Sequence, residues 1–296
     1  MCSPAVMHKV RDEMSRRRFL GRVGAAGAIT AVGAVALGPR GGAFQGVATP
    51  GAGVAATPTG PAPLALGGFT NILDLTHTSS PEFPMYPGAQ QMVINLLETV
   101  EESGFYKNEL ILDEHTGTHM DSPAHFDTDG VTADRLPVER FVAPLVVIDI
   151  SQRALSDPDA QLTPDDIVSW ESTNGPLPAG AFVAMNSGWE SRVNDPVAYI
   201  NLDASDVQHY PGFHPDAAAL LVDERDIVGI GVDTLSLDYG ASADFKTHLT
   251  VLPAGKYGIE NLASLSQAPV TGATIIIGGP KHINASGGPT RAYALF

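Results

Sequence analysis

The sequence predicts an α/β fold, with a mixed β-sheet or barrel-like β core flanked by helices. Nearly continuous aliphatic runs, which are typical of strands buried on both faces, occupy residues 144–150, 181–186, 227–233 and 274–280. A helix is expected over 163–171, because Thr163 can cap its first turn and acidic residues follow at its positive end. A second helix is expected over 217–224. Helices between buried strands are the pattern of an α/β domain.

The first 68 residues differ in composition from the rest of the chain. Residues 1–45 contain arginines at Arg16–Arg18, then Phe-Leu and an apolar segment at 24–37 that is shorter than a membrane span of about 20 residues. This order predicts a twin-arginine export signal, and a periplasmic or extracellular protein with no stable membrane span after cleavage. The alternative is an uncleaved membrane anchor. Residues 46–68, rich in Gly, Ala, Pro and Thr, are expected to be a linker, and 69–296 a single domain.

Charge and cysteine content exclude several classes of protein. Of the 17 basic and 33 acidic residues, seven and two lie in 1–45, which leaves 10 basic and 31 acidic residues and a net charge of −21. Such a surface repels phosphate backbones, so nucleic-acid binding is not expected. The only cysteine is Cys2, so the chain beyond the signal has neither a disulfide nor a thiol nucleophile.

Before the first aliphatic run, the chain is expected to alternate between strands and turns. Strands are expected over 72–77, 91–97 and 106–112. Three prolines within 81–87 exclude a central strand or helix there, and predict a rigid loop that carries Phe83 and Tyr86. The strand at 106–112 leads directly into a histidine-rich segment. A loop at the end of a strand is the usual place for a site on a rigid scaffold.

Three histidines and one aspartate lie at alternate positions of the segment 113–126, namely His115, His119, Asp121 and His125. In an extended chain they would share one face, but His115 and His119 would then lie about 13 Å apart. Two imidazoles on one ion need nitrogens only about 2.0–2.1 Å from it, so we expect the chain to bend at Gly117. Pro123 then prevents an inner strand from continuing. The pattern predicts a strand that breaks into a metal-binding turn; the simpler interpretation is a polar surface loop.

The string HTGTHMDSPAHF resembles the signature of the cyclase-like metal-dependent hydrolases, whose best-known members are the bacterial kynurenine formamidases, or arylformamidases. That signature runs His-x-Gly-Thr-His-x-Asp-x-Pro-x-His-Phe, and all eight fixed positions are matched. The resemblance extends from about Leu73 to the C-terminus. It implies a cyclase-like fold, a small-molecule substrate, and homodimers or larger homo-oligomers.

The resemblance also implies which residues hold metal. One ion would be held by His115, His119 and Asp121, and Asp121 would bridge to a second ion held by His248 and Glu260. His248 and Glu260 are twelve residues apart, with Pro253 and two glycines between them, so no single helix carries both. We expect a hairpin-like excursion to bring them together.

Further roles follow from the same resemblance. His125 would be the general acid/base that serves the leaving amine. Tyr86, before Pro-Gly, would lean over the substrate, and Trp189, at the end of the strand 181–186, would wall the pocket. Each aromatic residue has a structural alternative, since Tyr86 can pack its own loop and Trp189 can seal the core. A serine nucleophile at Ser187 is not indicated, because Gly-x-Ser-x-Gly is absent.

A ligand set of His, Asp and Glu without thiolate suits zinc or manganese, with one or two ions per chain. Such an ion lowers the pKa of bound water from about 15.7 to near 7, which supplies hydroxide at neutral pH. By resemblance, the chain is expected to hydrolyse an aromatic formamide, as in the conversion of N-formylkynurenine to kynurenine and formate in tryptophan catabolism. The alternatives are an isatin-type cyclic amide or lactone hydrolase, and a non-catalytic exported binder of metal or small molecules. Export counts against tryptophan breakdown as the physiological task, because that breakdown normally occurs inside the cell.

Overall fold

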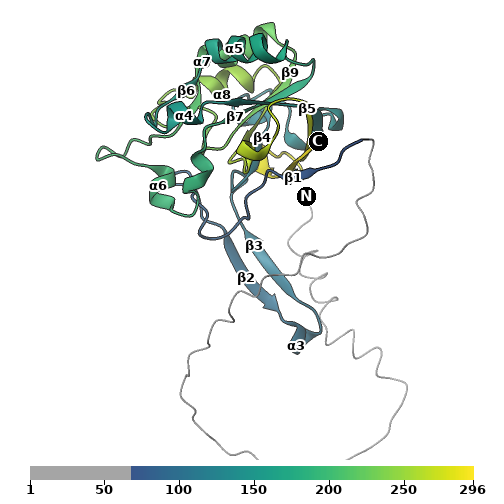
Figure 1. The fold of residues 1–296 in the computed structure, drawn as a ribbon. Helices are drawn as coiled ribbons and strands as arrows, with labels where there is room; N and C mark the ends of the chain where they lie inside the picture. Colours follow the sequence, from purple (N-terminus) through teal and green to yellow (C-terminus); the bar gives the residue numbers. More distant parts are fainter. Residues whose placement is uncertain (1–67) are drawn as a thin grey trace, which may run out of the picture. The chain divides into compact units, whose positions relative to one another are not determined.

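The computed structural model describes residues 68–296, which fall within one compact unit (Figure 1). The predicted export signal at 1–45 and all but the last residue of the predicted linker lie outside the described residues. Within the described part, none of the helices has the length and apolar character needed to cross a bilayer.

The core is a nine-stranded mixed sheet in the order β1-β13-β11-β5-β7-β9-β10-β4-β12. These strands are, in that order, Ile72–Asp74, Arg291–Leu295, Ala273–Gly278, Val142–Asp149, Ala181–Asn186, Ile227–Val232, Tyr257–Glu260, His119–Asp121 and Gly287–Pro289. The central strands β5, β7, β9 and β10 run parallel, and the strands outside them pair antiparallel. The sheet ends at β1 and β12, so it is open and not a closed barrel. The predicted mixed α/β fold is confirmed.

The central strands are apolar at nearly every position, so both faces of the sheet must be shielded from water by other elements. In β7, Val183 and Met185 pack on the face covered by three helices, while Phe182 and Ala184 pack on the opposite face. The covering helices are α5 (Pro164–Asn174), α7 (Pro215–Glu224) and α8 (Lys246–Val251) (Figure 1). The predicted helices at 163–171 and 217–224 correspond to α5 and α7.

Helix α5 begins where the sequence indicated. The backbone N–H of Thr163 donates to the Asp166 carboxylate at 2.8 Å, and an Arg153 guanidinium nitrogen lies 2.6 Å from the same carboxylate. The first bond caps the start of the helix, and the second holds the Asp166 carboxylate in place. Trp170 then fastens the helix to the sheet, since its indole Nε1 donates to the backbone oxygen of Val147 at 3.1 Å.

The remaining elements are short. A hairpin of β2 (Val93–Glu98) and β3 (Lys107–Ile111), with α3 (Val100–Ser103) at its tip, joins the proline-rich loop to the histidine-rich segment (Figure 1). The other short elements are α4 (Ser151–Ala154), α6 (Pro196–Ile200), a parallel pair of β6 (Gln161–Leu162) and β8 (Gly212–Phe213), and 3-10 turns at Pro123–His125, Ala133–Arg135, Val138–Phe141, Trp189–Arg192 and Leu265–Gln267. The loops at both ends of the hairpin contribute to the site described next.

Candidate metal centre and substrate pocket

The histidine-rich segment changes direction at the residue that the sequence indicated. Strand β3 ends at Ile111, and Gly117 then adopts a φ of +65°, a left-handed conformation that glycine tolerates. The next residues form the buried strand β4, which Pro123 ends by starting a 3-10 turn that carries His125. The predicted bend at Gly117 and the break at Pro123 are confirmed.

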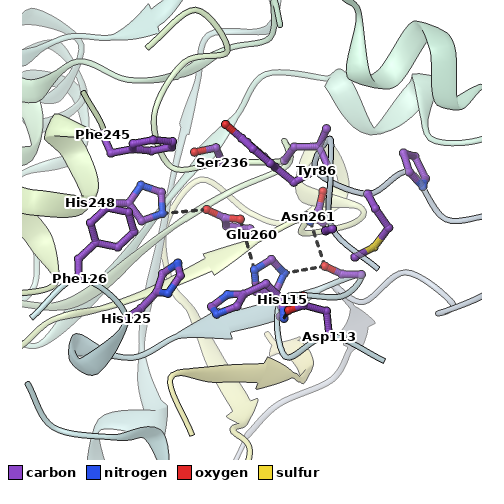
Figure 2. Close-up of a pocket in the computed structure, with 16 residues that line it drawn as sticks. Tyr86, Asp113, His115, His125, Phe126, Ser236, Phe245, His248, Glu260 and Asn261 are labelled. Atoms are coloured by element: carbon purple, nitrogen blue, oxygen red, sulfur yellow. Dashed lines mark hydrogen bonds and ion pairs between the residues drawn. The ribbon is translucent and has the colours of Figure 1, made fainter. Parts of the chain in front are cut away.

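His248 and Glu260 lie together at the site, but the elements that carry them differ from the predicted ones. His248 lies on helix α8 and Glu260 at the end of strand β10, so the connection is helix to strand and the predicted hairpin-like excursion is wrong. The two side chains nevertheless meet, with His248 Nε2 3.2 Å from Glu260 Oε1 (Figure 2). Strand β10 pairs with β4 so that Glu260 lies opposite His119.

Four of the predicted ligands form a buried set, which we call the inner group: His119, Asp121, His248 and Glu260. Their exposed fractions lie between 1% and 5%. His119 Nε2 lies 3.4 Å from Asp121 Oδ1 and 3.3 Å from Glu260 Oε2. His248 Nε2 lies 3.4 Å from Asp121 Oδ2. The second nitrogen of each ring is engaged elsewhere, since Nδ1 of His119 bonds the Gly117 carbonyl at 2.9 Å and Nδ1 of His248 bonds Asp238 Oδ2 at 2.6 Å.

The other two histidines form an outer group with Asp121. His115 Nδ1 lies 2.7 Å from Asp121 Oδ1, and the His125 ring stacks on the His115 ring with 4.0 Å between centroids. One ligand atom from each of His115, Asp121 and His125 falls within 4.8 Å of the others. In the structure His119 faces Glu260, His115 stacks on His125, and Asp121 approaches histidines of both groups. The predicted assignment of these residues to one or two ions stays a prediction.

The electrostatics of these groups fit a divalent cation. Burial opposes ionisation of Asp121, but the three histidines that surround it outweigh burial and hold the pKa of this carboxyl well below its usual value. Burial also lowers the pKa of His119, yet Asp121 and Glu260 raise it more strongly, to about 10. Among the described residues, His119 Nε2 and Asp121 Oδ2 are buried atoms without a hydrogen-bond partner. Nitrogen and oxygen donors that face one another in this way suit zinc or manganese.

A cavity of about 310 Å³ opens onto both groups. Its metal-facing side includes His115, His125 and Glu260. Its other walls are mainly apolar and include Met85 and Leu235. Tyr86, Phe126 and Phe245 complete these walls (Figure 2). Tyr86 therefore lies where a substrate contact was predicted. A small pocket with apolar walls and a few converging polar groups is typical of a small-molecule site.

Trp189 does not line this cavity, which corrects the prediction that it walls the pocket. Its exposed fraction is 2%, and it packs in a cluster with Tyr199, Tyr210 and Leu235. Its indole Nε1 donates to the Tyr199 carbonyl at 2.8 Å, and the Arg192 guanidinium lies 3.7 Å from its ring centre. Trp189 thus supports the wall from behind, which is the structural alternative given above.

Sequence reasoning missed several residues of the site. Phe126 and Phe245 flank His248, with ring centroids 4.7 Å and 6.0 Å from it. Phe126 ends the histidine-rich segment, so its position next to His125 was a usable signal. Asp238, which orients His248, had no local signal because ten residues separate the two side chains.

Comparison with known proteins identifies the family of this chain. The Cyclase family model matches residues 73–239, more than half of the chain. The chain belongs to the Cyclase family. This family member is 34% identical over 248 residues to an isatin hydrolase of Roseibium aggregatum, across 78% of this chain and 93% of the relative. It is 27% identical over 223 residues to a kynurenine formamidase of Salinibacter ruber, across 75% and 95%.

Solved structures agree with these relatives. The structure of isatin hydrolase A from Ralstonia solanacearum has a TM-score of 0.74 to this Cyclase family member, with 36% sequence identity over 81% of this chain and 99% of that one. The predicted membership of the cyclase-like metal-dependent hydrolases is therefore confirmed.

Proposed function

We propose that this Cyclase family member hydrolyses the carbon–nitrogen bond of a small aromatic amide, and that a cyclic amide of the isatin type is the favoured substrate. The observation that supports this most strongly is the position of the inner and outer groups at one side of a cavity with aromatic walls. Similarity to isatin hydrolases at 34–36% identity, against 27% for the kynurenine formamidase, favours the cyclic amide over the formamide.

The walls of the pocket suit a flat aromatic ring. Phe126 and Phe245 line the cavity with aromatic rings, and Leu235 belongs both to the lining and to the Trp189 cluster. The lining also includes His115, His125 and the carboxylate of Glu260. A neutral amide would therefore enter with its ring among the apolar residues and its carbonyl toward the histidines.

Catalysis requires a bound cation and a group that moves protons. When bound, a divalent ion supplies Lewis-acid polarisation of the carbonyl and lowers the pKa of water at the site. Burial lowers the pKa of His125, so its imidazole is neutral near pH 7 and free to accept a proton. His125 lines the cavity, so it would accept a proton from the water that adds to the carbonyl carbon and pass that proton to the nitrogen released when the C–N bond breaks.

The test is a substrate screen with the full chain loaded with zinc or manganese, paired with elemental analysis. We expect isatin-type cyclic amides to be hydrolysed, with activity lost on chelation and restored by the metal. Preference for N-formylkynurenine would instead support the formamidase alternative. Metal binding without turnover of cyclic amides, formamides or lactones would contradict the enzyme and leave the non-catalytic binder.

We also propose export through the twin-arginine pathway, on the basis of the arginine pair before Phe19 and Leu20. Replacing Arg16 and Arg17 together by lysine should retain the protein inside the cell, as measured by fractionation. Arg40→Lys is the matched control. Equal export of the double variant would contradict the proposal.

A further inference from the structure

Asn261, which directly follows Glu260, bonds the turn that leads into strand β4. Its amide Nδ2 donates to the Gly117 carbonyl at 2.9 Å, although 144 residues separate the two in sequence (Figure 2). Its own backbone carbonyl accepts from the Thr118 hydroxyl at 2.5 Å. One residue therefore holds the Gly117–Thr118 part of the turn by two hydrogen bonds.

The backbone of Asn261 is itself fixed. Its φ is +55°, a left-handed conformation that asparagine adopts more readily than most residues. Its N–H donates to the Thr234 carbonyl at 2.9 Å, and its exposed fraction is only 2%. The amide group therefore starts from a rigid, buried position at the end of β10.

Tyr199 bonds the other end of this amide. The hydroxyl oxygen of Tyr199, a fully buried residue of α6, lies 2.9 Å from Asn261 Oδ1 and 3.0 Å from the Asp233 carbonyl oxygen. A backbone carbonyl only accepts hydrogen bonds, so the amide presents its NH₂ group to Gly117 and its oxygen to the Tyr199 hydroxyl. The hydrogen bonds therefore run in one direction, from Tyr199 through Asn261 to Gly117.

The Gly117 carbonyl is where this chain of bonds reaches the inner group. His119 Nδ1 lies 2.9 Å from the same oxygen, so the position of that oxygen sets the orientation of the His119 ring. A carbonyl oxygen has two lone pairs and can accept both bonds. Glycine restrains its own backbone less than any other residue, so the carbonyl of Gly117 needs an external bond to hold it.

The ring of Tyr199 has a second contact, with the loop that carries Tyr86. The ring of Phe83 in that loop meets the Tyr199 ring edge-on, with 6.4 Å between centroids. The Tyr199 carbonyl accepts from Trp189 Nε1 at 2.8 Å, which fixes the backbone of α6. The hydroxyl of Tyr199 thus acts on the metal-binding turn, whereas its ring supports the substrate loop, and substitutions can separate the two.

We propose that Asn261 and Tyr199 are positioning residues which, through the Gly117 carbonyl, hold the His119 ring in the orientation that binds the cation. Neither residue is itself a metal ligand. This inference rests on the proposed metal-dependent function. Loss of a partner that orients a ligand typically weakens metal affinity by about 10- to 100-fold. It should also lower kcat more than it changes KM, because the substrate-binding walls remain in place.

The first test is a calorimetric titration of the metal-stripped full chain with manganese or zinc alone. Asn261→Gly removes the amide and keeps the left-handed backbone, so it should weaken the metal affinity by about 10- to 100-fold. Asn201→Gly is the matched control. Asn201 also has a left-handed φ, of +50°, and its amide donates to a backbone carbonyl, that of His209, at 2.7 Å. Unaltered affinity in Asn261→Gly would overturn the inference.

The second test removes only the hydroxyl of Tyr199. Tyr199→Phe should weaken the metal affinity by about 2- to 10-fold, the effect of one hydrogen bond, and leave KM unchanged because the ring still packs on Phe83. In Asn261→Gly the same substitution should have no further effect, since the hydroxyl acts through Asn261. Tyr257→Phe, which removes a buried hydroxyl bonded to the Arg140 carbonyl at 2.8 Å, is the control. Additive losses in the double variant would overturn the inference.

The visible absorption spectrum of the cobalt(II)-loaded protein gives a readout that does not depend on activity. The bands should change in Asn261→Gly and in Tyr199→Phe, but not in the two controls, because the geometry of the ligands around the ion changes. Lower folding stability with an unchanged spectrum would show that Asn261 only supports the fold, and would overturn the inference. A protein that binds no metal at all would instead overturn the proposed function.

Discussion

The inner and outer groups share Asp121 but are built in different ways. The inner group comes from two paired strands and a helix, and its members are almost completely buried. The outer histidines come from a loop and a 3-10 turn, and both are half-buried. Strand pairing fixes ligand positions before any ion arrives, whereas loop ligands need separate partners to hold them. The inner group is therefore the more rigid and more buried part of the site, and the outer group is the more exposed part.

The largest effect is expected from breaking the inner group. Glu260→Gln removes a buried carboxylate that faces two histidines, so metal content should fall and kcat/KM should drop by at least about 10³-fold. Elemental analysis and steady-state kinetics measure both quantities. Glu139→Gln, at an exposed position, is the control. Full metal content with full activity would show that the inner group is not the metal site.

The second prediction distinguishes the role of the outer group from that of the inner group. His125→Gln changes the outer group only, so the inner ion should be retained while kcat falls by about 10²- to 10⁴-fold, the usual contribution of a general acid/base. Kinetics and metal content measured on the same preparation test this. Unchanged turnover would remove His125 from the mechanism.

Most of the scaffold could be predicted from the sequence because its signals are local. The aliphatic runs correspond to β5, β7, β9 and β11, Thr163 and Asp166 mark the start of α5, and Gly117 marks the bend. The arrangement of the site could not be predicted in the same way. Strand pairing brings His119 opposite Glu260 from 141 residues away, and no spacing in the sequence encodes that register.

Two wrong predictions, for the connection between His248 and Glu260 and for Trp189, also result from contacts that the local sequence does not encode. Pro253 and the glycines near it were interpreted as turns of a hairpin, yet the residues before them continue helix α8 because they pack against the sheet. Trp189 was assigned to the pocket because it ends a strand, but a hydrogen bond to the Tyr199 carbonyl holds it in the core. Tertiary contacts decided both cases.

A smaller effect, on the pH dependence of folding stability, is expected at the buried Asp233. Burial raises the pKa of Asp233 to about 6, although the backbone N–H groups of Ser187 and Trp189 donate to it. The folded protein therefore holds this proton more tightly than the unfolded chain does. The resulting stabilisation is complete below about pH 3.8 and is lost as the pH rises through 6, by at most about 3 kcal/mol.

Urea unfolding between pH 3.5 and 7 measures this effect. The free energy of unfolding of the unchanged protein, relative to that of Asp233→Asn, should decrease across this range. For Asp216→Asn, at an exposed carboxylate, the free energy of unfolding should change with pH as it does in the unchanged protein. A constant difference for Asp233→Asn would contradict the raised pKa.

The smallest effect is expected from loosening an inner ligand without removing it. In Asp238→Asn the carboxylate that bonds His248 Nδ1 becomes a weaker acceptor, so the affinity of the inner ion should fall by about 10- to 100-fold. A calorimetric metal titration of the metal-stripped protein measures this affinity. Unchanged affinity in Asp238→Asn would contradict the prediction.

The pairing of β1 with β13 has a consequence for folding. Of the described strands, β13 is the sole neighbour of β1, and Thr70 and Asn71 donate to the carbonyl of Phe296. Ile72 and Leu295, which pair in this ladder, are 223 residues apart in the sequence. Bringing such distant segments together carries a large loop-closure entropy, so this edge of the sheet is expected to form late in folding.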